Sequence, residues 1–306
     1  MPTNFDVSGL SAYVQDNRDL LIKNFALVGT ATRRRISIQT GVKGKANINF
    51  LEVASVLQDG SGCGFTAADE IALTKRTIET AILKVNGEIC PKTLIGTYAE
   101  TLVRIDAKEE SLPFEQYVAE AVVAEVNKKI ETFIWQADHT SADPELSLGD
   151  GFLYIAAADV PAAQQVTIAG NDAYNDILAV YSAAPEEALE RGLEIYVSPA
   201  YFRAFVQALV AANLYHYSGP QDSYPEVFIF PGTDAKVVRT PGLKGLASQV
   251  ILATFAKNLF YGCDIESASE DIDIWYSKDD RVVRYAVEWN SGVQIAFPEY
   301  AVLGTV

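Results

Sequence analysis

Residues 111–136 read SLPFEQYVAEAVVAEVNKKIETFIWQ, and this stretch sets the architecture of the chain. Ser111 stands where an N-cap belongs and Pro113 falls in the first turn, so we expect a helix from about Leu112 to Gln136. At 1.5 Å per residue, such a helix is roughly 37 Å long, which is more than a compact domain needs. The stretch therefore predicts a spine along which other elements pack.

One apolar stripe runs along this predicted helix. Its members recur every three or four positions, while glutamates and lysines occupy the other faces. This is the pattern of a helix that buries one face, so we expect the stripe to lie beneath a sheet. The residues predicted to form this core are Phe114, Val118, Val122, Val126, Ile130 and Ile134.

Residues before the helix alternate between apolar and polar. Residues 36–42 and 46–50 each alternate, and the glycines between them predict a β-hairpin. Asn86 and Gly87 give a second hairpin signal, because both central residues of a type I′ turn need positive φ. Together these patterns predict an extended β arm from about residue 30 to residue 90. Such an arm has few residues that could fill a core of its own.

Residues after the helix follow a mixed pattern of helices and strands, beyond a turn-rich break at 144–151. Apolar runs bounded by Gly, Asp or Pro mark the strands. We expect helices at 171–181, 185–192 and from Pro199 to about Ala212, a buried strand at 193–197, and strands at 227–230, 236–239, 249–254, 272–276 and 282–289, the last two joined as a hairpin at 278–280.

Charge is distributed unevenly along the chain. Lys and Arg number 24 against 40 Asp and Glu, and the net charge of −16 argues against attraction of the whole surface to nucleic acid. Residues 1–50, however, hold seven basic and three acidic residues. This asymmetry suits an arm that docks on an acidic neighbour or faces nucleic acid, although a solvated basic strand is the alternative. The basic residues concerned are Arg33, Arg34, Arg35, Lys43 and Lys45.

Residue types that carry catalysis are scarce. The two histidines, His139 and His216, stand in no catalytic motif, so helix-end and packing roles are favoured. A glycine-rich stretch at 60–64 lacks the Lys-Ser/Thr of a phosphate loop. The acidic run at 264–273 lacks the regular ligand spacing of a calcium loop, which favours a solvated face. We therefore expect a protein that is not an enzyme and has no cofactor or metal.

The three cysteines and the hydropathy profile indicate a protein made in the cytoplasm. Cys63, Cys90 and Cys263 are an odd set without metal spacing, so free thiols are expected, with a Cys63–Cys90 bridge as the alternative. No apolar run reaches the roughly 18 to 20 residues needed to cross a bilayer. The opening MPTNFDVSGL has neither a basic nor an apolar signal region.

The order of these elements resembles the major capsid proteins of tailed bacteriophages, which share the Hong Kong 97-like fold. Two stretches carry the local likeness: ICPKTLIGTYAETL at 89–102 and VVRYAVEWNSGVQIAFPEY at 282–300. The resemblance covers nearly the whole chain and implies an α+β fold. It divides the chain into an N-arm (1–30), an E-loop with an adjoining P-domain strand (31–105), a P-domain with the spine helix (106–164), an A-domain (165–262) and terminal strands that return to the P-domain (263–306).

The resemblance also implies a function and partners. Copies of the chain would assemble as hexamers and pentamers into an icosahedral shell in the host cytoplasm, and would end in the virion capsid. The shell would contact packaged double-stranded DNA non-specifically, with scaffolding, portal and decoration proteins as further partners and no membrane.

Three other interpretations are compatible with the sequence. An encapsulin-type nanocompartment shell would share the fold but enclose cargo enzymes. A soluble homo-oligomeric α/β enzyme would have to show a cluster of titratable groups with perturbed pKa values in a pocket. A tail-tube or head-completion protein would form tubes or rings instead of closed shells.

Overall fold

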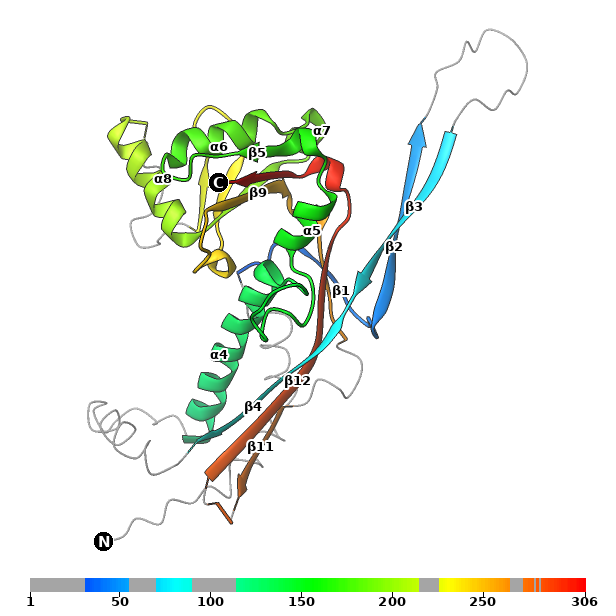
Figure 1. The fold of residues 1–306 in the computed structure, drawn as a ribbon, viewed down its shortest axis with the longest axis vertical. Helices are drawn as coiled ribbons and strands as arrows, with labels where there is room; N and C mark the ends of the chain where they lie inside the picture. The colour runs from blue at the N-terminus through cyan, green and yellow to red at the C-terminus, as the bar shows by residue number, and fades with distance from the viewer. Residues whose placement is uncertain are drawn as a thin grey trace, which may run out of the picture.

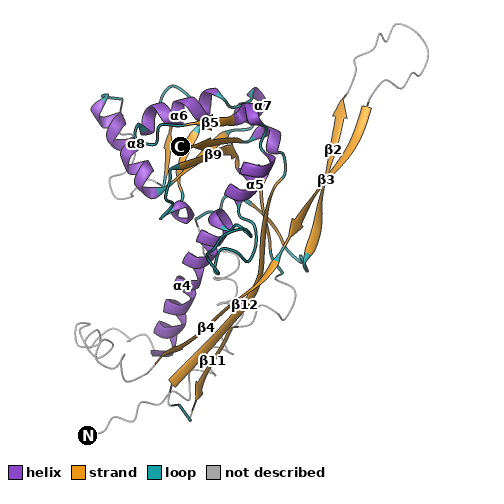
Figure 2. Ribbon diagram, in the orientation of Figure 1, coloured by secondary structure: helices purple, strands orange, loops and turns teal. Residues whose placement is uncertain are grey.

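The computed structural model describes residues 31–54, 70–89, 114–214, 226–264, 272–277, 279–280 and 282–306. These residues form three parts: a six-stranded sheet covered by helices, a long sheet with a helix beside it, and a two-stranded ribbon that projects away from both (Figure 1). Figure 2 shows most of the helices gathered around the first sheet. The fold class is therefore α+β, as predicted. The predicted N-arm at 1–30 and Ser111 and Pro113 lie outside the described residues.

The six-stranded sheet, which we call the helix-covered sheet, takes all its strands from the second half of the chain. In spatial order its strands are β5 (Gln165–Thr167), β13 (Val302–Thr305), β9 (Val250–Phe255), β6 (Leu193–Val197), β8 (Lys236–Arg239) and β7 (Val227–Ile229), and its helices are α6 (Ala173–Ser182), α7 (Glu186–Glu190) and α8 (Pro199–Ala211). β6 pairs with β8 and β9 on its two edges, and it is buried at every position because its alternate side chains lie in two core clusters, one on each face of the sheet. α8 begins where the Ser198 side chain accepts a hydrogen bond from the backbone N–H of Tyr201, which confirms the predicted helix start.

The long sheet is built on one 14-residue strand. Its strands are β1 (Ser37–Gln39), β10 (Leu259–Gly262), β12 (Val282–Ile295) and β11 (Ile272–Ser277) in that order, with β4 (Ala81–Ile89) also paired to β12. β11 and β12 are antiparallel from Ile272 opposite Val287 to Ser277 opposite Val282, which confirms the predicted hairpin. β4 pairs with β12 over nine positions. β12 is therefore paired with a neighbouring strand along most of its length.

Helix α4 (Phe114–Gln136) is the predicted spine and ends beneath the helix-covered sheet. Its Trp135 ring is fully buried, 5.2 Å from the ring of Tyr196 in β6. On its other side Trp135 contacts Phe152 at 5.3 Å, in helix α5 (Phe152–Asp159). The end of α4 thus packs against the helix-covered sheet through aromatic contacts. Short 3-10 helices complete the fold at Ala162–Gln164 (η2), Pro241–Leu243 (η3), Ala256–Asn258 (η4) and Pro298–Tyr300 (η5).

The ribbon consists of β2 (Lys45–Ala54) and β3 (Glu70–Glu79). The two strands are antiparallel over ten positions, from Lys45 opposite Glu79 to Ala54 opposite Glu70. Among the described strands, neither β2 nor β3 pairs with a third one. The ribbon therefore has no third strand on either edge within the described residues, as the extended arm predicted from the sequence would.

The strand pairing predicted for residues 36–50 is wrong. Residues 36–42 and 46–50 do not form a hairpin with each other, because β1 pairs in parallel with β10 and β2 pairs with β3. Gly41 and Gly44 do have positive φ, so the chain bends between the two segments. Alternation identified strands, but the pattern does not say which other strand supplies the hydrogen bonds.

The turn predicted at Asn86 and Gly87 is also wrong. Both residues lie inside β4, opposite Ala286 and Tyr285 of β12. A Cβ atom at Gly87 would overlap the ring of Tyr285. The glycine therefore makes room for an aromatic side chain on the next strand and does not provide a turn.

Two predicted domain boundaries do not coincide with the sheets. β10 lies in the long sheet, although residues 165–262 were predicted as one domain. β13 lies between β5 and β9 in the helix-covered sheet, although 263–306 were predicted to return to the P-domain. The chain therefore crosses between the two sheets after β9 and again after β12. No helix within the described ranges is long and apolar enough to span a membrane.

Candidate intersubunit surfaces

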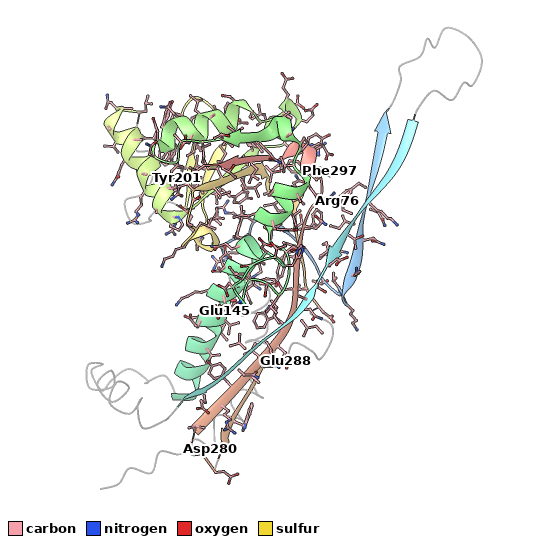
Figure 3. All side chains as sticks on the ribbon, in the orientation of Figure 1. Arg76, Glu145, Tyr201, Asp280, Glu288 and Phe297 are labelled. Atoms are coloured by element: carbon pink, nitrogen blue, oxygen red, sulfur yellow. The ribbon has the colours of Figure 1, made fainter. Side chains whose placement is uncertain are left out.

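The root of the ribbon packs against the rest of the subunit. Ile48 and Ile78, which lie diagonally across the two strands, are both buried. The Phe50 ring lies 4.4 Å from the ring of Phe297 and 6.3 Å from that of Phe260. Figure 3 shows Phe297 at the level where the ribbon leaves the body. The root is therefore part of the subunit's own core, and the segment beyond it is the part that needs other partners.

Polar contacts fix the direction in which the ribbon leaves the body. Arg76 forms an ion pair with Asp159 at the end of α5. The Gln294 side chain donates a hydrogen bond to the backbone carbonyl of Thr77 at 2.8 Å. These contacts tie β3 to α5 and to β12, so they hold the ribbon at one angle to the long sheet.

Two glycines allow the ribbon root to approach the long sheet closely. Gly262 and Gly292 lie opposite each other on β10 and β12. A Cβ at Gly262 would come within 2.9 Å of the Ile78 side chain, and one at Gly292 would overlap the carbonyl oxygen of Glu79. The chain between β3 and β4 thus crosses the long sheet at a point where side chains would block its approach.

We predict that Gly292→Ala destabilises the subunit by about 2 kcal/mol or more, because the clash is with backbone that cannot rotate away. Gly245→Ala is the control, since its positive φ costs about 1 kcal/mol but its Cβ would meet nothing within 4 Å. Urea unfolding of both variants checks the difference. Equal losses of stability in the two variants would mean that the ribbon root can move away from the added methyl group, so that glycine is not needed at position 292 for its close approach.

Two of the basic residues predicted as intersubunit or lumen-facing contacts are engaged within the subunit, which corrects that prediction. Arg33 is only 1% exposed; its Nη2 donates to the Asn127 side chain of α4 at 2.7 Å, and its guanidinium lies over the Tyr261 ring. Arg35 forms an ion pair with Glu194 of β6 at 3.6 Å. Both side chains join the segment before β1 to elements that are distant in the sequence.

The Arg35 ion pair belongs to a buried network. The phenol of Tyr196 donates a hydrogen bond to Glu194 at 2.9 Å. Burial, together with the adjacent Glu194 carboxylate, raises the pKa of Tyr196 well above its usual value, so the phenol stays protonated and continues to donate. Lys236 lies 4.0 Å from the same carboxylate and is more exposed. Arg35 is therefore a closer cationic partner than Lys236 for a carboxylate that water barely reaches.

We predict that Arg35→Glu destabilises the fold by about 2 kcal/mol, because it places a second carboxylate beside the buried Glu194. The double variant Arg35→Glu with Glu194→Arg should recover part of this loss. Arg203→Glu reverses a charge on the exposed side of α8 and serves as the control. Thermal unfolding of the unchanged chain and the three variants measures the effect. If Arg35→Glu unfolds at the same temperature as the unchanged chain, the Arg35–Glu194 pair contributes nothing to stability.

The other three basic residues are exposed. Lys43 precedes the ribbon, and Lys45 begins it with an ion pair to Glu79 at 2.5 Å. Arg34 is also exposed. A role for these three side chains toward a neighbouring copy or DNA stays a prediction.

The stripe along α4 faces the interior wherever its side chains are described. One cluster of buried side chains joins these residues to Leu83 of β4 and to Val287 and Trp289 of β12. The Phe114 and Val118 side chains lie outside the described residues. The buried members of the stripe are Val122, Val126, Ile130 and Ile134.

Exposed apolar side chains occur at places that the sequence did not indicate. At the helix-covered sheet, Val210 and Leu214 lie at the end of α8 and Ile229 ends the edge strand β7. On the long sheet, Ile82 is 78% exposed and Trp275 is also exposed. Exposed apolar side chains that stand singly are normal on protein surfaces, and only a contiguous patch marks an interface. Their exposure depends on which face of a strand or helix is covered, and the sequence pattern did not reveal this.

The residues considered for chemistry occupy ordinary structural positions or are not described. His139 follows α4, where its Nδ1 lies 2.7 Å from Asp150 and its ring meets Tyr154 edge to face. Cys263 is buried. In the described part of the chain no three metal-ligating side chains come together. His216, Cys63 and Cys90 lie outside that part, as does most of the acidic run at 264–273.

Comparison with solved structures gives matches along nearly the whole chain. A chain of the satellite phage P4 procapsid, which includes the size determination protein Sid, matches with a TM-score of 0.62 and 15% identity over 100% of this chain and 92% of that one. The capsid of cyanophage P-SCSP1u matches with a TM-score of 0.53 and 12% identity, over 90% and 88%. The SrpI encapsulin of Synechococcus elongatus matches with a TM-score of 0.56 and 8% identity, over 92% and 88%.

No protein-family model and no curated protein matches the sequence. At identities of 8 to 15% the structural matches establish the fold. They confirm the resemblance that was drawn from the order of the spine helix, the extended arm and the mixed α/β region. The chain therefore has the Hong Kong 97-like fold that these phage capsid and encapsulin shell subunits share.

Proposed function

We propose that this chain is the major capsid protein of a tailed bacteriophage. It is a structural subunit without catalytic activity that assembles as hexamers and pentamers into an icosahedral shell around double-stranded DNA. The observation that carries the proposal is the ribbon, whose ten-residue strands project from the body and pair only with each other among the described strands.

Physical chemistry explains why such a ribbon needs neighbours. An isolated two-stranded hairpin is marginally stable in water, and unpaired strand edges are templates for association. In a monomer the segment beyond the root would expose both edges to solvent. In a closed symmetric shell every copy would meet the same surface of its neighbour, so one modest contact would be repeated around each symmetry axis.

The exposed basic residues suit this function as contacts. Lys43 and Lys45 stand at the base of the ribbon and Arg34 stands close to β1. In a chain of net charge −16, a local basic surface would favour an acidic surface of the next copy or the phosphates of packaged DNA. Contacts to phosphates carry no sequence information, so DNA binding would be non-specific.

A second candidate function is an encapsulin-type shell, favoured by the match to an encapsulin at a TM-score of 0.56. The subunit fold does not separate a capsid from an encapsulin, because both are closed shells. The content of the shell does separate them. A capsid holds DNA, whereas the encapsulin alternative would hold protein cargo.

The experiment is to express the full chain, with any required scaffolding protein, and to examine the product by sedimentation and negative-stain electron microscopy. We expect closed particles. A stable monomer or dimer at high concentration would refute the shell function. Particles isolated from the native source should contain DNA, and cargo proteins in place of DNA would establish the encapsulin alternative.

A further inference from the structure

Aromatic rings form a strip between the root of the ribbon and the helix-covered sheet. It begins with Phe260 of β10 and Phe50 of β2, continues through Phe297, and ends with Tyr300 of η5 and Phe255 of β9. The centroids of neighbouring rings lie 4.4 to 6.3 Å apart, so the strip is continuous. All of these residues except Phe255 are only partly buried. We call them the aromatic strip.

Buried hydrogen bonds hold the middle of the strip in place. The fully buried Asn258 side chain donates from Nδ2 to the backbone carbonyl of Phe297 at 2.8 Å, and its Oδ1 accepts from the backbone N–H of Phe297 at 2.7 Å. Both backbone groups of Phe297 are therefore fixed by one side chain. A surface that is already ordered loses little conformational entropy when a partner covers it.

Arg191, which follows α7, lies on the aromatic strip. Its guanidinium carbon is 5.0 Å from the ring centroid of Tyr300, 5.2 Å from that of Phe255 and 6.0 Å from that of Phe297. Arg191 is exposed, and no residue in the described ranges forms an ion pair with its guanidinium or accepts a hydrogen bond from it. The guanidinium therefore has N–H groups to offer a carboxylate from outside the subunit.

A partner that suits this surface is apolar and carries carboxylates but no cations. Aromatic residues and arginine are enriched where proteins bind each other, which favours a protein partner. Residues 51–74 of the same sequence have the matching composition: aliphatic residues, Glu52, Asp59, Asp69 and Glu70, and neither lysine nor arginine. The strands β2 and β3, which carry both ends of this segment, project away from their own body (Figure 1). The segment therefore suits the aromatic strip of a second copy.

We propose that the aromatic strip and Arg191 receive the ribbon of a neighbouring copy. Aliphatic residues of the segment 51–74 cover the partly buried rings, and Glu52 or Glu70 pairs with Arg191. This contact rests on the shell function proposed above and adds to it the surface on which the ribbon docks. Because the two surfaces differ, each copy gives its ribbon to one neighbour and receives that of another, which is the head-to-tail pattern that closes rings.

Charge reversal in the full-length protein tests the contact. Arg191→Glu should raise the protein concentration needed for particle assembly by at least about tenfold, because repulsion replaces a charge-assisted hydrogen bond. Glu52→Arg together with Glu70→Arg should have a similar effect from the side of the ribbon. Combining all three changes should recover most of the loss. Arg203→Glu makes the same charge change on the exposed side of α8, so this variant should assemble like the intact chain.

Photo-crosslinking identifies the partner directly. With p-benzoylphenylalanine in place of Tyr300, irradiation of assembled particles should link this position to a peptide within residues 51–74. Particles made from a mixture of isotope-labelled and unlabelled chains show whether the two linked peptides come from different copies. We expect links between copies.

The outcomes separate this contact from the shell function. If the intact chain forms no particles, the shell function fails and the contact fails with it. If the intact chain forms particles but Arg191→Glu assembles at the same concentration, or the crosslinks reach only residues outside 51–74, the shell function stands and the contact is refuted. Normal assembly of Arg191→Glu with a loss of packaged DNA would assign Arg191 to DNA and also refute the contact.

Thermal unfolding of each variant verifies that the subunit is intact. The ribbon variant with Glu52→Arg and Glu70→Arg leaves the surroundings of Arg191 unchanged. It therefore tests the contact even if Arg191→Glu loosens the end of α7.

Discussion

Replacing Ile130 by aspartate should abolish the folded protein. Ile130 is 1% exposed and lies in the core cluster between α4 and the long sheet. The substitution removes a buried apolar side chain and puts a carboxyl group in its place without a partner, which costs on the order of 5 kcal/mol. Most domains are stable by only about 5 to 15 kcal/mol. We therefore expect insoluble protein, or a soluble fraction without a cooperative unfolding transition.

A matched control exists at Ile82, which carries the same side chain on β4 but is 78% exposed. Ile82→Asp should change stability by about 1 kcal/mol or less, because it buries no charge and costs only strand propensity. Circular dichroism and thermal unfolding compare the two variants directly. If Ile130→Asp unfolds at the same temperature as Ile82→Asp, the stripe along α4 does not support the core.

Elements with strong local signals could be predicted from the sequence. The strand at 193–197 is apolar except for Glu194 and is followed by Ser198 and Pro199, and the structure has the strand, the cap and the helix at these residues. The period of the apolar stripe likewise gave α4 its extent up to Gln136. In both cases the decisive interactions lie within a few residues of each other, so the sequence contains them in one stretch.

Pairing between distant segments could not be predicted in the same way. β1 finds its partner in β10, and the β3–β4 junction crosses the sheet at Gly262 and Gly292. Asn86 and Gly87 carry a strong turn signal that Tyr285, on a distant strand, overrides. The sequence alone does not distinguish a glycine that allows close approach of another side chain from a glycine that allows a turn.

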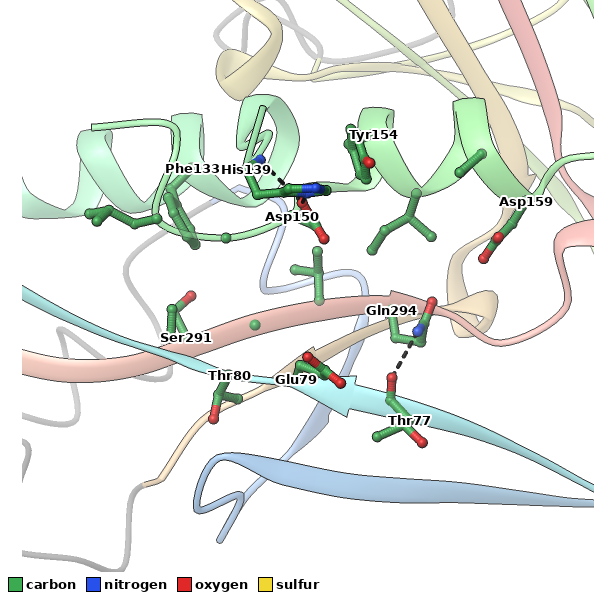
Figure 4. Close-up of a pocket in the computed structure, with 17 residues that line it drawn as sticks. Thr77, Glu79, Thr80, Phe133, His139, Asp150, Tyr154, Asp159, Ser291 and Gln294 are labelled. Atoms are coloured by element: carbon green, nitrogen blue, oxygen red, sulfur yellow. Dashed lines mark hydrogen bonds and ion pairs between the residues drawn. The ribbon is translucent and has the colours of Figure 1, made fainter. Parts of the chain in front are cut away.

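The three adjacent arginines show that the burial of charged residues could not be predicted from the sequence either. Arg33, Arg34 and Arg35 are adjacent, yet the first is buried, the second is exposed and the third pairs with Glu194. Changing all three to glutamate would therefore test folding as much as assembly. The cavity at the root of the ribbon (Figure 4) was not predicted, because the residues that line it come from β3, the α4–α5 connection and β12, which are distant in the sequence.

Shortening the ribbon should abolish shells and spare the fold of the subunit. Leu51 and Leu73 lie opposite each other, so replacing residues 52–72 by Asn-Gly closes a two-residue turn between them. The anchors Ile48, Phe50 and Ile78 all remain, and we expect cooperative unfolding within a few degrees of the intact chain. If each subunit loses about 3 kcal/mol of contact with its neighbours, association weakens roughly 100-fold. Sedimentation and electron microscopy should then show free subunits or small capsomers.

Asn47→Ala is the matched control, because it breaks an exposed side-chain hydrogen bond with Thr77 on the same ribbon without shortening it. Such a hydrogen bond contributes about 1 kcal/mol, so this variant should still form particles. Normal particles from the shortened chain would show that the outer ribbon makes no essential contact between subunits. Unfolding of the shortened subunit would show instead that the outer ribbon supports its own core. Assembly restored by mixing in intact chains would place the missing contact on the ribbon, since a shortened subunit can still receive the ribbon of its neighbour.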